Sequence, residues 1–183
     1  MRAVLRCDAS PGIGAGHAMR CLVIGETLTR LGWDVAFAST AETVATVPGI
    51  RRSGLQVLSP DPRDHGRAAF DVAILDHYGL AEADRAAWAD TARLLVVFSD
   101  FVGPHRLAGL LVDPTPCRVP DDYADMVPPE CRLLLGPDYA LVAAAWRAER
   151  AASLSRRAKA GKVEKILVSM GATDPKGATL RVL

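Results

Sequence analysis

The stretch RAVLRCDASPGIGAGHAMRCL, residues 2–22, gives the strongest indication of the fold. Residues 2–7 are mostly apolar, as in a strand that is buried on both faces of a parallel sheet. A turn with glycines at positions 12, 14 and 16 follows, and then an amphipathic pattern with helical spacing that stops at Gly32. A strand, a glycine-rich turn and a helix are typical of the first unit of an alternating α/β fold.

The next part of the chain continues this alternation. Further short apolar runs predict strands at 34–39, 55–59, 70–76, 94–99, 109–113 and 132–136, and helical patterns cover 81–93 and 140–161. Residues 114–131 contain several prolines and are expected to be long irregular structure. The pattern predicts an α/β fold with a Rossmann-like, doubly wound parallel sheet.

The last residues look like the start of another unit of the same kind. After Gly161 the sequence predicts a strand at 165–170, a turn, and the beginning of a helix. We therefore expect three parts: an N-terminal Rossmann-like domain (1–144), a connecting helix (145–162) and the truncated start of a nucleotide-binding domain (163–183). An unpaired apolar strand tends to find another sheet edge, so we expect residues 165–170 to form a homodimer contact.

Composition excludes several classes of protein. Of the 183 residues, 22 are basic and 21 acidic, a balance that gives no electrostatic reason to bind nucleic acid or an anionic membrane. No apolar run approaches the roughly 20 residues of a bilayer span. The four cysteines form no CxxC pair, which predicts reduced thiols in a cytoplasmic protein. The four histidines show no short ligand spacing, so neither a metal site nor a cofactor is expected.

The glycine turn does not match the common nucleotide fingerprints. The third glycine of G-x-G-x-x-G is missing, the acidic residue Asp34 lies at the start of its strand, and no Lys-Ser/Thr follows the turn. The distinctive residues are His17 at the helix start and Arg20 on nearly the same face. The helix dipole favours a neutral imidazole that accepts a proton. Alternatively, His17 packs the helix and Arg20 braces the loop.

Polar residues follow two of the expected strands. Asp76, His77 and Tyr78 end the strand at 70–76, and Ser99 and Asp100 end the strand at 94–99, with His105 farther on. The carboxyl ends of parallel strands border the ligand crevice, so we expect these groups on the same side as His17. The alternative is a structural role, in which Asp76 hydrogen-bonds to the backbone nearby and Tyr78 is hydrogen-bonded within the protein.

Four motifs together carry a resemblance to a known family. RCDASPGIGAGHAMRCLVIGETL, ILDHYG, LLLGPDYALV and ILVSMGATDP occur in this order over essentially the whole chain. They resemble the UDP-2,4-diacetamido-2,4,6-trideoxy-altropyranose hydrolases of pseudaminic acid biosynthesis and their spore-coat polysaccharide relatives. The resemblance implies a GT-B fold, in which the active site lies between two Rossmann-like domains. It also implies metal-independent hydrolysis of a UDP-sugar at the anomeric C–O bond.

The resemblance also implies residue roles. His17 is the base that activates water, and Tyr78 is a second catalytic residue. The substrate-binding residues would be Asp8, Gly14, Gly16, Arg20, Asp76, His77, Asp100, Gly171, Thr173 and Asp174. Most of a second domain is absent, so we expect weak binding and slow turnover.

Two alternatives stay open. One is a glycosyltransferase, in which His17 deprotonates an acceptor hydroxyl. The other is a non-catalytic sugar-nucleotide-binding module, which is favoured by Ser99 standing where the family usually has an aspartate.

Overall fold

The computed structural model describes residues 1–159, 161–163, 165–174 and 176–183. The strands are β1 (Arg2–Cys7), β2 (Asp34–Ala38), β3 (Gln56–Leu58), β4 (Phe70–Asp76), β5 (Ala92–Phe98), β6 (Leu110–Asp113) and β7 (Arg132–Leu135). The helices are α1 (Gly16–Arg30), α2 (Ala41–Thr46), α3 (Gly49–Arg52), α4 (Glu82–Asp90), α5 (Ala144–Ala158) and α6 (Ala178–Val182).

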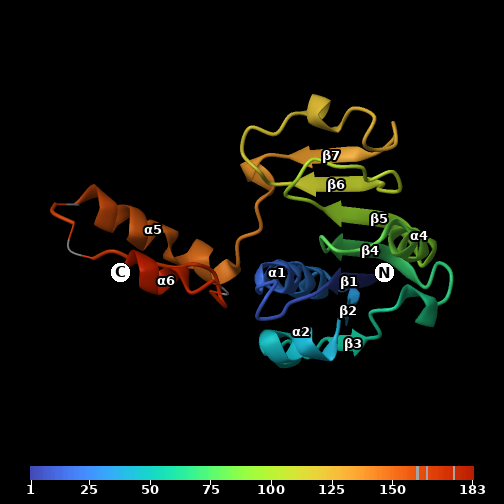
Figure 1. The fold of residues 1–183 in the computed structure, drawn as a ribbon, viewed down its shortest axis with the longest axis horizontal. Helices are drawn as coiled ribbons and strands as arrows, with labels where there is room; N and C mark the ends of the chain where they lie inside the picture. The colour runs from blue at the N-terminus through green and yellow to red at the C-terminus, as the bar shows by residue number, and fades with distance from the viewer. Residues whose placement is uncertain (160, 164, 175) are drawn as a thin grey trace.

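The strands form one parallel sheet of seven strands in the order β3-β2-β1-β4-β5-β6-β7, and Figure 1 shows them side by side in this order. Every neighbouring pair in this order is parallel. Each of these strands overlaps an apolar run that the sequence predicted as a strand. The structure therefore confirms the predicted Rossmann-like α/β fold.

Helices cover both faces of the sheet, as expected for a doubly wound fold. Successive side chains of a strand point to opposite faces, and β1 illustrates this with Leu5 and Val4. Leu5 belongs to a buried cluster that includes residues of α1, whereas Val4 belongs to a second cluster with Trp88 of α4. These two cores fix α1 and α4 on opposite sides of the same sheet.

The strand order reverses direction between β1 and β4. From β1 the chain proceeds to β2 and β3 on one side, and it then returns to place β4 on the other side of β1. In the register of this pair, Cys7 of β1 lies beside Asp76 of β4. In open α/β sheets, ligands bind outside the carboxyl ends of the strands at such a switch point.

The helices differ from the sequence predictions mainly at their ends. α1 begins at Gly16, so His17 lies in the first turn, as expected. The short helices α2 and α3 were not predicted from the sequence, although the Thr40 side chain caps α2 by accepting a hydrogen bond from the Thr43 amide. α5 is shorter at both ends than the predicted helix at 140–161.

The predicted strand at 165–170 was wrong. These residues are irregular and form no ladder with another described segment, and Ile166 and Leu167 are 81% and 90% exposed. A strand needs a neighbour that accepts and donates its backbone hydrogen bonds, and the described residues provide none here. The turn and the short helix α6 follow as expected. None of the helices in the described ranges is long and apolar enough to cross a membrane.

Candidate functional site

A histidine–aspartate pair lies at the switch point. His17 is buried in the first turn of α1, and its Nδ1 lies 2.7 Å from Oδ1 of Asp76, the fully buried last residue of β4. A carboxylate accepts hydrogen bonds, so Nδ1 carries the proton in this pair and Nε2 keeps its lone pair. Nε2 has no hydrogen-bond partner among the described residues. This arrangement produces an oriented base.

Arg20 joins this pair to a second carboxylate. Its Nε and Nη2 donate to the two oxygens of Asp76 at 2.6 Å each, and its Nη1 donates to Asp100 at 2.9 Å. Burial alone would lower the pKa of Arg20, but the hydrogen bonds to Asp76 and Asp100 raise it above its ordinary value. The guanidinium therefore stays charged and is engaged by the protein's own carboxylates, which favours the bracing alternative for Arg20.

Tyr78 closes the cluster. Its ring meets the His17 ring edge-on, with centroids 4.3 Å apart, and its hydroxyl donates a hydrogen bond to Asp100. Burial and the neighbouring carboxylate of Asp100 raise the pKa of Tyr78 to about 12, so the phenol remains a donor at neutral pH. Burial would raise the pKa of Asp100, but the hydrogen bonds from Arg20 and Tyr78 hold it below its ordinary value.

Asp8, which directly follows β1, is the centre of a neighbouring cluster. Arg6 donates to both of its carboxylate oxygens at 2.7 and 2.9 Å, and His77 Nε2 lies 2.9 Å from one of them. The Gly79 amide donates to His77 Nδ1, so the ring proton is on Nε2 and points at Asp8. Burial opposes ionisation, but the hydrogen bonds from His77 and Arg6 hold the pKa of Asp8 well below its usual range.

Arg6 was not among the residues that the sequence analysis proposed for the site. The signal was present, because Arg6 is a charged residue in an apolar strand and lies two positions before Asp8. Residues two apart in an extended segment share a face, so this spacing predicts that the side chains of Arg6 and Asp8 lie close together. Thr43 of α2 was missed as well, and its hydroxyl lies 3.3 Å from Asp8.

The glycine turn lies beside the C-terminal segment. Gly14 has φ of +90°, and a Cβ atom added there would lie 3.9 Å from Thr173 Oγ1, so residues 14 and 173 are neighbours. Figure 1 shows the segment before α6 returning toward the first helix. A Cβ added at Gly16 would meet no atom within 4 Å, which leaves open space above the start of α1.

Gly171 and Asp174, the other two proposed residues of the 171–174 turn, do not lie beside the glycine loop as Thr173 does. A Cβ added at the exposed Gly171 would meet nothing within 4 Å. The Asp174 carboxylate accepts hydrogen bonds from the Ala178 and Thr179 amides at 2.8 and 3.0 Å, so it holds the start of α6. Of this turn, Thr173 is therefore the residue that comes nearest to the glycine loop.

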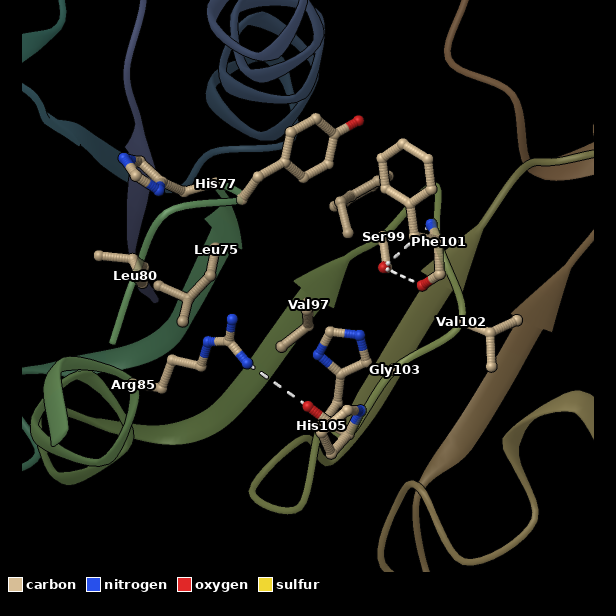
Figure 2. Close-up of a pocket in the computed structure, with 13 residues that line it drawn as sticks. Leu75, His77, Leu80, Arg85, Val97, Ser99, Phe101, Val102, Gly103 and His105 are labelled. Carbon is tan, nitrogen blue, oxygen red and sulfur yellow. Dashed lines mark hydrogen bonds between the residues drawn. The ribbon is translucent and has the colours of Figure 1, made fainter. Parts of the chain in front are cut away.

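A pocket of about 270 Å³ adjoins the cluster on the α4 side of the sheet, and Figure 2 shows its lining residues. His77 and Tyr78 form part of its wall, and the loop with Phe101 and His105 forms the opposite part. The described residues contain no group of three or more His, Cys, Asp or Glu side chains arranged to hold a metal ion.

Comparison with known proteins shows what the chain is similar to. No protein-family model matches the chain. The chain is 26% identical over 189 aligned residues to the UDP-2,4-diacetamido-2,4,6-trideoxy-beta-L-altropyranose hydrolase of Campylobacter jejuni subsp. jejuni serotype O:2. The match covers 100% of this chain and 64% of that protein. The resemblance carried by the sequence motifs is thus confirmed: the chain is similar, along its whole length, to the N-terminal part of a UDP-sugar hydrolase.

Proposed function

We propose that the protein hydrolyses a UDP-linked diacetamido-trideoxy sugar at the anomeric C–O bond, releasing UDP and the free sugar for nonulosonic acid biosynthesis. The observation that carries the proposal is the contact of 2.7 Å between His17 Nδ1 and the buried Asp76, which leaves His17 Nε2 as an oriented acceptor for a proton. The similarity to the Campylobacter jejuni hydrolase supports the choice of reaction.

The proposed reaction balances with these groups alone. His17 Nε2 takes a proton from water while the water oxygen forms a bond to the anomeric carbon. The C–O bond to UDP breaks, and UDP leaves with the electron pair. The imidazolium is stabilised by Asp76, whose second oxygen is held by Arg20. The proton then leaves His17 to solvent, which restores the base.

Tyr78 and the Asp8 cluster have separate roles in this proposal. Tyr78 packs on the imidazole and limits its rotation, and its exposed position lets the same ring contact the sugar. Asp8 and His77 lie at the neighbouring strand ends, where the carboxylate of Asp8 has lone pairs left to accept hydrogen bonds from sugar hydroxyl or amide groups and His77 holds that carboxylate in place. Asp76 and Arg20 act through His17 and are positioning residues.

The start of α1 is the proposed site for the diphosphate. Ala15, the residue that precedes the helix, provides no side-chain cap, so the first amides of α1 are available to an anion. Gly16 leaves room for a close approach, and Thr173 lies across the loop from Gly14. The chain spans 64% of the relative's length, and we propose that it corresponds to the first half of a GT-B arrangement. The chain alone is therefore expected to turn over slowly.

The proposal is tested by incubating the chain with the diacetamido sugar nucleotide in ¹⁸O-labelled water. Hydrolysis at the anomeric carbon puts ¹⁸O into the sugar, whereas attack on phosphorus puts it into the nucleotide. Label in the nucleotide would contradict the proposed reaction. Release of UDP that requires an added sugar acceptor would instead indicate a glycosyltransferase. Binding of the sugar nucleotide without any release would indicate a non-catalytic module.

We also propose a cytoplasmic location. The described cysteines are free thiols, and Cys7 and Cys21 are buried. Free thiols are usual in reducing compartments. Fractionation of growing cells, followed by detection of the chain with an antibody, would test this location. Recovery of the chain outside the cytoplasmic fraction would contradict it.

A further inference from the structure

The pocket beside Tyr78 contains a histidine that the proposed reaction does not use. Both ring nitrogens of His105 are buried, and neither has a hydrogen-bond partner among the described residues. Buried polar atoms without partners are rare in folded proteins because each loses its hydrogen bonds to water. Figure 2 shows the His105 ring among the lining residues, near Val97. The ring therefore has hydrogen-bonding capacity left for a ligand.

Most other polar groups of the pocket are already engaged. The Ser99 hydroxyl donates to the Phe101 carbonyl, the Tyr78 hydroxyl donates to Asp100, and both His77 nitrogens have partners. Arg85 differs, because its guanidinium makes one hydrogen bond of 3.4 Å to the Pro104 carbonyl and lies 3.9 Å from Glu82. Unused polar capacity is thus concentrated at Arg85 and His105.

The chemistry of these two groups selects a ligand. Burial, and then the charge of Arg85, lower the pKa of His105, so the ring is neutral at physiological pH and offers one donor and one acceptor. A carboxylate has no donor for the ring's lone pair, and Arg85 repels an ammonium group. A secondary amide has an N–H to donate and a carbonyl to accept. The remaining wall includes Leu75, Val97 and Val102, which suit a methyl group.

We propose that this pocket binds an N-acyl group of the sugar nucleotide and so determines specificity for acylated sugars. The amide N–H donates to the unprotonated nitrogen of His105, the carbonyl accepts from Arg85, and the acyl methyl lies on Leu75 and Val97. Tyr78 connects the two sites, since its ring contacts His17 and lines the pocket. The inference rests on the proposed function for its substrate, but binding can be measured without turnover.

The first test is NMR of the histidine side chains in the 183-residue chain. N-methylacetamide and N-acetylglucosamine are added, with acetate and glucosamine as controls. We expect the His105 signals to shift and saturate with the two amides, and not with the controls. A larger response to acetate would overturn the proposal in favour of an anion site. No response to any probe would overturn it in favour of a pocket filled by water.

The second test uses His105→Leu, which removes both nitrogens and keeps an apolar side chain of similar reach. We expect affinity for the diacetamido sugar nucleotide to fall about tenfold, the value of roughly one lost hydrogen bond to a well-placed partner. The thermal midpoint should stay equal or rise, because two unpaired buried atoms are removed. His65→Leu, a half-buried histidine outside the pocket, is the matched control.

These outcomes separate the two proposals. Lost affinity with an unchanged midpoint supports the acyl site, even if no UDP is released. A lowered midpoint with unchanged affinity shows a structural role for His105 and overturns the acyl site. Normal UDP release by His105→Leu, with equal affinity for acylated and non-acylated sugar nucleotides, also overturns it and leaves the proposed hydrolysis intact.

Discussion

His17 gains its proposed function from the residue that it contacts. An isolated imidazole can carry its neutral proton on either nitrogen, whereas the 2.7 Å contact with Asp76 assigns it to Nδ1. Asp76 is itself held by two donors of Arg20, and Arg20 by Asp100. The orientation of the base therefore depends on a chain of charged side chains that never need to contact the substrate.

Asp76→Asn is the sharpest test of this orientation. Arg20 donates to both oxygens of Asp76, so the new amide group faces an N–H donor in either orientation, and the preference of His17 for one tautomer is lost. We expect kcat to fall about 10²–10⁴-fold with KM little changed. Asp71→Asn, in the other half of β4, is the control and should retain activity. Equal rates for both variants would argue against an orienting role.

The partly buried carboxylates of Asp8 and Asp100 should also set the stability of the fold at acid pH. Asp8 and Asp100 have pKa values below the ordinary 3.8 in the folded chain. A carboxyl group with a lowered pKa stabilises the fold above its unfolded pKa, and this stability disappears as the pH falls through the lower folded value. We expect the urea concentration at the unfolding midpoint to fall as the pH is lowered below about 4, and to fall less steeply in Asp8→Asn. The same dependence of the midpoint on pH in Asp8→Asn and in the wild type would contradict this assignment.

At the scale of elements, the sequence predicted the parts that depend on local pattern. Apolar runs identified β1 to β7, and polar residues directly after β4 and β5 indicated the edge where the candidate site lies. The pairing of Arg20 with Asp76 and Asp100 could not be read in the same way, because 56 and 80 residues separate the partners. Such pairing depends on strand order, which local pattern does not contain.

At 165–170 the local pattern predicted a strand that the structure does not contain. Its pattern was as apolar as that of true strands, but a strand also needs a partner, and the described residues supply none there. Arg6 was missed because site residues were expected only after the ends of strands, and Arg6 lies within β1, two residues before Asp8.

The glycine turn gives a matched pair of variants. Gly14 has φ of +90°, so Gly14→Ala should cost about 1 kcal/mol of unfolding free energy. Gly16 has open space around its Cβ position, so Gly16→Ala should fold as well as the wild type or slightly better. If the space serves a diphosphate, Gly16→Ala still weakens binding of the sugar nucleotide, as titration calorimetry would detect. Unchanged binding would indicate that the ligand lies elsewhere.

At the scale of the whole molecule, the most exposed apolar side chains lie near the C-terminus. Ile166, Leu167 and Leu180 are each more than 80% exposed. Such groups favour association, and the homodimer expected from the sequence stays a prediction. We expect sedimentation velocity to show a dimer whose population rises with concentration, and the double variant Ile166→Asp/Leu167→Asp to be monomeric. A wild-type monomer at every concentration would contradict this.

The central proposal is that His17 is the base of a UDP-sugar hydrolase. The similarity to a longer hydrolase of this kind supports the choice of reaction. The most direct measurement is the rate of UDP release from the diacetamido sugar nucleotide by the wild-type chain and by His17→Ala, with His65→Ala as the control. Because a positioned base contributes about 10²–10⁴-fold, we predict a loss of that size in His17→Ala and none in the control. UDP release by His17→Ala at the wild-type rate would contradict the account.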